Sequence, residues 1–146
     1  MEQFTLNGHI VKVDVKRTKE LYEKLPFVSD KAHCGCTDCI YYAKAIVHTS
    51  LAIQHFFEQF GIDPSKEAEV WKACENDDGT YYYIADYHFM GEIQGALQLD
   101  WIDVEKASFG LTNYSGNLPS PMIPETFTPP IVEFVVKINL PSDLNN

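Results

Sequence analysis

Three cysteines within six residues are the part of the sequence best suited to chemistry. They lie in the run His-Cys-Gly-Cys-Thr-Asp-Cys at residues 33–39. Structural zinc is held tetrahedrally, commonly by Cys₄ or Cys₃His sets, and thiolates packed this closely can share one ion. The sequence therefore predicts a metal site, with zinc as the cofactor that fits and Cys34, Cys36 and Cys39 as ligands. The fourth ligand is either His33 or Cys74.

The same thiols allow two other interpretations. Cys36 and Cys39 form a Cys-x-x-Cys pair at the start of a predicted helix, where the helix dipole favours a reactive thiolate. Asp38 opposes this redox hypothesis because its carboxylate lies beside the thiols, and no parallel strand–helix–strand unit is visible around the pair. The third interpretation is packing, since a reduced cysteine behaves as a small hydrophobic residue. Cys39 falls on an apolar helix stripe, and Cys74 falls on an apolar strand face.

A second group of chemically capable residues lies on a predicted strand. Asp86, His88 and Glu92 occupy even-numbered positions, so they share one face. In a cleft they could act as an acid–base group. Alternation along a single strand produces such sets readily, so the sequence favours a structural role for them.

One long helix, over about residues 38–60, is expected to position the cysteines. Apolar residues recur every three or four positions from Cys39 to Phe60. Asp38 is a suitable N-cap, and Gly61 is a suitable residue just beyond the C-terminus. A weaker helical pattern occupies residues 17–26 and stops at Pro26.

The rest of the pattern is that of an antiparallel sheet. Asn7-Gly8 is typical of a type I′ turn, and Asn-Asp-Asp-Gly at residues 76–79 predicts a second hairpin. Strands are expected near residues 4–6, 11–15, 68–75, 80–93, 106–114 and 131–140. We therefore predict an α+β fold in a single domain, residues 1–146, with the long helix packed on a mainly antiparallel sheet of about five strands.

The charge distribution restricts the partners. Residues 61–146 carry fourteen acidic and four basic side chains, which accounts for the whole net charge of −10, and Arg17 is the only arginine. Such a chain lacks the cationic surface that phosphate contacts require, so nucleic acid is not an expected partner. The acidity indicates a solvated surface or, alternatively, a surface for a basic partner. A protein or a small molecule is the expected partner, of unknown identity.

The location is inferred from what the sequence lacks. No apolar run is long enough for a membrane span, and the first residues do not resemble a signal peptide. Four cysteines without a disulfide framework are typical of a reducing compartment. We expect a cytoplasmic protein without a membrane partner.

The sequence also resembles a family of small uncharacterised bacterial proteins. The shared motifs are Cys34-Gly35-Cys36-x-x-Cys39 before Tyr41-Tyr42, the turn Gly61-Ile62-Asp63-Pro64, and Tyr87-His88-Phe89-Met90-Gly91-Glu92-Ile93. The resemblance implies a bacterial source and makes the cysteine run a shared feature, but it carries over no activity and no catalytic residue. We therefore expect a non-catalytic binding or interaction module with a cysteine-based metal site. A thiol-dependent redox enzyme and an acidic inhibitor or immunity-type protein are the alternatives.

Overall fold

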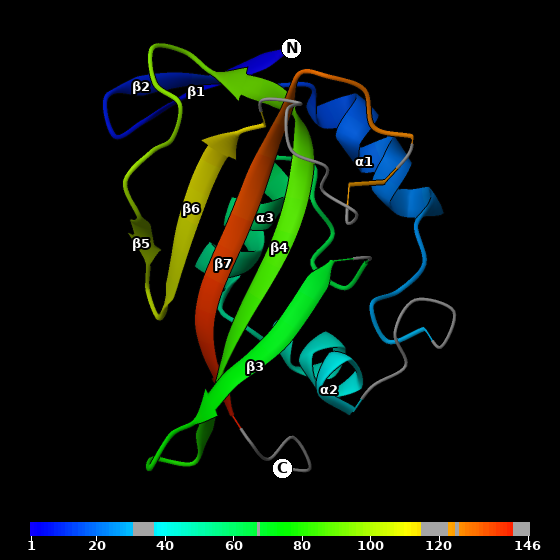
Figure 1. The fold of residues 1–146 in the computed structure, drawn as a ribbon, viewed down its shortest axis with the longest axis vertical. Coiled ribbons are helices and arrows are strands. Elements are labelled where there is room, and N and C mark those ends of the chain that lie inside the picture. Colours follow the sequence, from blue (N-terminus) through cyan, green and yellow to red (C-terminus); the bar gives the residue numbers. More distant parts are fainter. Residues whose placement is uncertain (31–36, 67, 115–122, 125, 142–146) are drawn as a thin grey trace.

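A computed structural model describes residues 1–30, 37–66, 68–114, 123–124 and 126–141 (Figure 1). The helices α1, α2 and α3 span Val15–Lys24, Thr37–Ile46 and Leu51–Gln59. The strands β1 to β7 span Glu2–Leu6, His9–Val13, Glu69–Glu75, Thr80–Ile93, Ile102–Val104, Ala107–Asn113 and Ile131–Pro141. Across these described ranges, no helix is long and apolar enough to span a bilayer.

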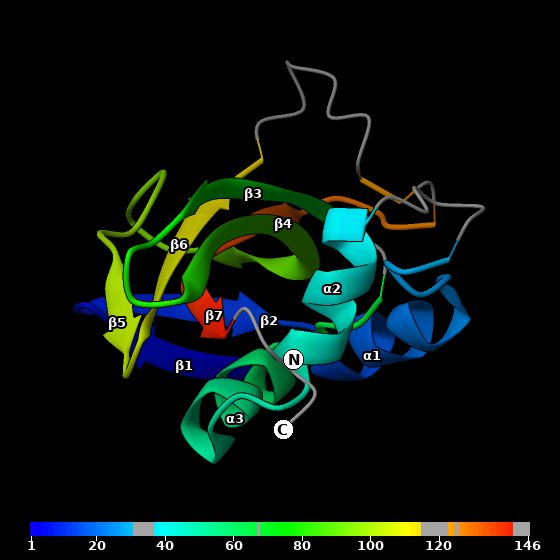
Figure 2. The same ribbon diagram turned by 90° about the horizontal axis from the view of Figure 1, so that it is seen from below.

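The sheet is antiparallel throughout and is centred on β4 and β7. The strand order is β1-β2-β4-β7-β6-β5, and β3 is also paired with β4. Two strands thus share one edge of β4: β3 pairs with residues 81–86 and β2 pairs with residues 91–93. Figure 1 shows α3 behind β4 and β7, and α1 beside the upper part of β4. Figure 2 shows α2 and α3 on the same side of β3 and β4.

Helix α1 supplies hydrogen bonds to β4 between its two strand partners. The Tyr22 hydroxyl donates to the carbonyl of His88 at 2.8 Å and accepts from the amide of His88 at 3.2 Å. Next to it, Thr18 Oγ1 accepts from the amide of Met90 at 3.1 Å, and the amide of Asp14 donates to the carbonyl of Met90 at 2.8 Å. Because buried backbone groups must be paired, these groups of α1 and its cap take the place of a strand.

An aromatic core lies between the sheet and the helices α2 and α3. Side chains alternate along a strand, so the odd-numbered residues of β4 and the even-numbered residues of β7 face this core. The closest ring contacts between the sheet and α3 with its C-cap Phe60 are Phe56–Phe109 at 4.4 Å, Phe60–Phe89 at 4.9 Å, Phe57–Tyr87 at 5.3 Å and Phe60–Phe134 at 5.3 Å. The even-numbered residues of β4 therefore project from the opposite face, which we call the outer face.

The prediction of one helix over residues 38–60 is wrong. The chain forms two helices there, α2 and α3, with a break after Ile46. The Thr49 hydroxyl donates to the carbonyl of Ile46 at 2.8 Å, and Ser50 Oγ accepts from the amide of Ile53 at 3.4 Å and so caps α3. Hydroxyl side chains compete with the helical ladder in this way. The apolar periodicity continues across the break because both helices pack on the same sheet.

The prediction of about five strands is also wrong, because the described residues form a sheet of seven strands. β5 has three residues, too few to show an alternating pattern. In β3 the register shifts between Lys72 and Cys74, so Cys74 is exposed rather than buried on an apolar face. The Asn7-Gly8 turn is confirmed, with φ values of 49° and 79°, and so is the strand over residues 80–93. Helices segregated from an antiparallel sheet keep the architecture in the α+β class.

We expect Gly61→Ala to lower the free energy of unfolding by about 2–4 kcal/mol, measured by urea titration. Gly61 follows α3 with φ at +78°, and a Cβ there would lie 2.6 Å from the carbonyl oxygen of Val15 in α1. Gly8→Ala is the matched control, because Gly8 has φ at +79° with nothing within 4 Å of a Cβ. In Gly8→Ala the free energy of unfolding should fall only by the cost of a positive φ for alanine, about 1 kcal/mol. Equal losses in the two variants would contradict a close approach of α3 to α1.

Candidate functional site

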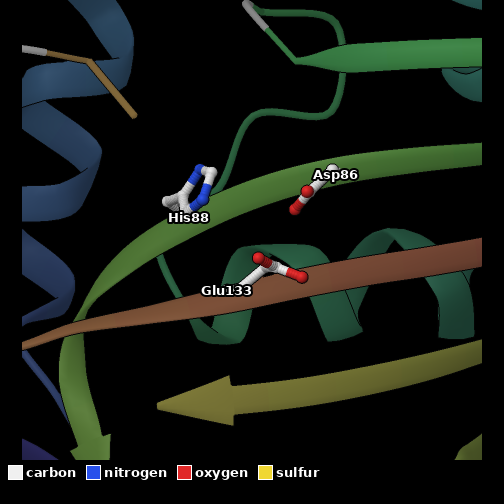
Figure 3. Close-up of side chains that lie close together, drawn as sticks. All are labelled: Asp86, His88 and Glu133. Atoms are coloured by element: carbon white, nitrogen blue, oxygen red, sulfur yellow. The ribbon is translucent and has the colours of Figure 1, made fainter. Parts of the chain in front are cut away.

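Asp86, His88 and Glu133 converge on the outer face of the sheet (Figure 3). Asp86 and His88 are two positions apart in β4 and so point the same way. Glu133 of β7 lies directly opposite His88 in the β4–β7 register, which places Cβ atoms about 4.5–5.5 Å apart. One potential ligand atom from each side chain lies within 4.8 Å of the other two.

The site is withdrawn from solvent at its His88 end. His88 is 2% exposed, and the outer-face residues Met90 and Ile131 are also buried. The Thr128 hydroxyl contacts Met90 Sδ at 3.7 Å, so the segment before β7 crosses this end of the face. Asp86 and Glu133 are partly buried. The three side chains are therefore set into the face rather than spread on its surface.

Two buried polar atoms in the site have no hydrogen-bond partner among the described residues. These atoms are His88 Nε2 and Asp86 Oδ1. A buried polar group without a partner costs about 1–3 kcal/mol, and native proteins keep few of them. Two such atoms beside a third ligand residue, Glu133, are expected where an ion or a proton completes the arrangement.

Burial determines the charge states of the site in the absence of metal. It lowers the pKa of His88 to about 4, so the imidazole is neutral at pH 7 and keeps a free lone pair. Burial, followed by repulsion from the carboxylates of Glu133 and Glu69, raises the pKa of Asp86 to about 8. The pKa of Glu133 is also raised, by burial first and then by Glu69. The site thus combines a neutral imidazole with carboxyl groups that repel one another when ionised.

One imidazole nitrogen and two carboxylates form a ligand set typical of divalent transition metals. Imidazole and carboxylate suit Zn²⁺, Fe²⁺ and Mn²⁺, whereas Ca²⁺ and Mg²⁺ prefer oxygen ligands alone. In a tetrahedral site with ligands at about 2.0–2.2 Å from the ion, two ligand atoms lie about 3.3–3.6 Å apart. The potential ligand atoms here lie within 4.8 Å of one another, so the carboxylates would rotate inward when the ion binds.

The cysteine site predicted from the sequence lies mostly outside the described residues, which do not include His33, Cys34 and Cys36. Cys39 is described and is 2% exposed on α2. Cys74 is exposed on β3, where its Sγ contacts Asn76 Oδ1 at 3.5 Å. The predicted zinc site therefore stays a prediction. The burial of Cys39 counts against its use as an accessible redox thiol.

The predicted acid–base set is only partly brought together. Asp86 and His88 are neighbours in the site, but Glu92 is exposed and pairs in register with Lys12 of β2. Glu133 takes the third place, and sequence reasoning missed it because the pairing of β4 with β7 is not visible in either strand alone. The signal that could have found it is a single carboxylate between the apolar outer-face residues Ile131 and Val135.

Comparison with known proteins adds no assignment. No protein-family model matches the chain, and no curated protein or solved structure is significantly similar to it. The resemblance to small bacterial proteins therefore stays a prediction, and a function must be argued from the site itself.

With a chelator present, we expect the free energy of unfolding to fall as the pH rises from about 6.5 to about 8. In this window the folded protein keeps a proton on Asp86 that the unfolded chain, with an ordinary pKa of 3.8, has released. His88 acts in the opposite sense, but only between its folded pKa of about 4 and its ordinary value of 6.5, so it does not mask the decline above pH 6.5. Urea titrations at a series of pH values measure the slope.

Asp86→Asn should remove most of this decline and raise the stability at pH 8 by about 1 kcal/mol or more. The amide keeps the shape of the side chain and cannot ionise. Asp100→Asn is the control, since Asp100 is exposed and lies outside the site. An undiminished decline in Asp86→Asn would show that the site does not hold this proton.

Proposed function

We propose that this chain is a binding module for one divalent transition-metal ion, held by Asp86, His88 and Glu133. Two observations carry the proposal. His88 Nε2 and Asp86 Oδ1 are buried without a hydrogen-bond partner among the described residues. One potential ligand atom from each of Asp86, His88 and Glu133 lies within 4.8 Å of the other two. A cation at this point would satisfy both atoms. It would also offset the repulsion from neighbouring carboxylates that, together with burial, raises the pKa values of Asp86 and Glu133.

A proton is the competing occupant. At neutral pH a proton on Asp86 removes one negative charge, but His88 Nε2 still has no hydrogen-bond partner among the described residues. A metal ion satisfies the imidazole and both carboxylates at once, so the ligand set as a whole favours the metal. Three protein ligands would also leave positions on the ion for water or for a group from a partner.

The cysteine run supports a separate hypothesis within the same proposal. If Cys34, Cys36 and Cys39 bind zinc with His33 or Cys74, the chain holds two metals of different ligand chemistry. A cytoplasmic location also belongs to the proposal, because reduced cysteines of this number are typical of a reducing compartment. Because the two sites would bind metal through different ligands, the experiment must distinguish binding by nitrogen and oxygen from binding by thiolates.

We expect wild-type protein, purified under reducing conditions and stripped with a chelator, to bind one Co²⁺ or Zn²⁺ at the outer-face site. His88→Gln should weaken this binding by at least about 100-fold, because it removes the one nitrogen ligand. His55→Gln is the matched control, since His55 is exposed on α3. Titration calorimetry gives affinity and stoichiometry, and Co²⁺ absorption separates thiolate ligands, which add intense near-ultraviolet bands, from nitrogen and oxygen ligands.

Binding that is equally strong in His88→Gln, or that shows only thiolate bands, would contradict the proposal. The double variant Cys34→Ser/Cys36→Ser completes the design. It should keep the outer-face site and lose any thiolate site, so each of the two hypotheses is tested by a change that leaves the other unaffected.

The affinity for Zn²⁺ should rise with pH and then level off near pH 8. The metal must displace the proton of Asp86, whose pKa is about 8, so below that value the apparent affinity should change about tenfold per pH unit. Competition titrations between pH 6 and 9 measure this slope. A slope of zero below pH 8 would mean that Asp86 is not a ligand that must first ionise.

A further inference from the structure

The backbone of His88 is held from outside the sheet by one side chain. The Tyr22 hydroxyl accepts from the His88 amide at 3.2 Å and donates to the His88 carbonyl at 2.8 Å. Both backbone polar groups of the only nitrogen ligand are therefore fixed by the same oxygen atom. In an ordinary sheet, a neighbouring strand would make these two bonds.

This contact falls where β4 changes partners. β3 pairs with β4 as far as Asp86, and β2 begins to pair with it at Gly91. His88 lies between them, so without α1 the backbone at this edge would have no partner among the described residues, and β4 here would be held only by β7 on its other edge. The side chain of a metal ligand follows its backbone, and displacements of about 0.5 Å are enough to spoil a site.

Tyr22 is itself firmly placed. It is 2% exposed, and its ring packs edge-on against Phe127 with the centroids 5.7 Å apart. Thr18, one helical turn earlier on α1, binds the amide of Met90 at 3.1 Å. The hydroxyl of Tyr22 thus reaches His88 from a helix that is anchored along the same edge of β4.

We propose that Tyr22 is the positioning residue of the outer-face metal site, holding the His88 backbone so that the imidazole nitrogen is aligned with Asp86 and Glu133. This inference rests on the proposed function, since it assigns a role within that site. Tyr22 is not a ligand, and it acts only through His88. Its hydroxyl therefore matters for affinity and coordination geometry even though it contacts no metal.

The test is Tyr22→Phe, which keeps the ring against Phe127 and removes only the hydroxyl. We expect its Co²⁺ affinity to fall about 10- to 100-fold, the range for loss of an outer-shell partner, with a change in the visible Co²⁺ spectrum. The matched control is Tyr42→Phe. It also removes a buried hydroxyl, one that is 2.6 Å from the Tyr87 hydroxyl in the core on the other side of the sheet. The control should keep the wild-type affinity and spectrum even where its stability falls.

Phe127→Leu provides a second variant in case Tyr22→Phe does not fold. It keeps the hydroxyl but loosens the ring that carries it, and we expect a smaller loss of Co²⁺ affinity. Wild-type affinity and spectrum in both Tyr22→Phe and Phe127→Leu, or an equal loss in Tyr42→Phe, would overturn this inference and leave the proposed function standing. A wild-type protein that takes up no Co²⁺ at all would overturn the proposed function, and this inference with it.

Discussion

The hydrogen bonds between α1 and the edge of β4 are the constraint on which the rest of this structure depends. β4 is fourteen residues long, and on one edge it pairs with β3 near its start and with β2 near its end. Between them, Tyr22, Thr18 and the amide of Asp14 pair the backbone of His88 and Met90. This keeps β4 continuous, and a continuous β4 can hold a single register with β7 over residues 80–90. That register brings His88 opposite Glu133.

The two faces of the sheet contribute opposite terms to stability. On the inner face, aromatic rings from α3 pack on rings of β4, β6 and β7, and this burial is the main favourable contribution. On the outer face lie a buried, neutral imidazole and partly buried carboxyl groups that repel one another, and two polar atoms there lack partners among the described residues. Such an arrangement destabilises the folded protein by itself. Binding of a cation is the simplest explanation for these residues, because the cation would offset that destabilisation.

The sequence predicted local features well and long-range ones poorly. The Asn7-Gly8 turn and the strand over residues 80–93 follow from turn chemistry and alternation, and both are confirmed. The break between α2 and α3 was missed because Thr49 and Ser50 act through hydroxyl hydrogen bonds that an apolar periodicity does not register. Asp86 and His88 were recognisable as a pair, but Glu133 comes from a strand over forty residues away, and only the β4–β7 register reveals it. The pairing of α1 with the edge of β4 was equally hidden. A tyrosine hydroxyl that makes the backbone hydrogen bonds of a neighbouring strand leaves no recognisable pattern in the sequence.

Anomalous diffraction at the zinc absorption edge, from crystals grown with Zn²⁺, tests the central claim most directly. The account predicts a difference peak on the outer face of the sheet, about 2.0–2.2 Å from a nitrogen of His88 and from oxygens of Asp86 and Glu133. No peak among these three side chains in crystals that hold zinc elsewhere, for instance at the cysteine run, would contradict it.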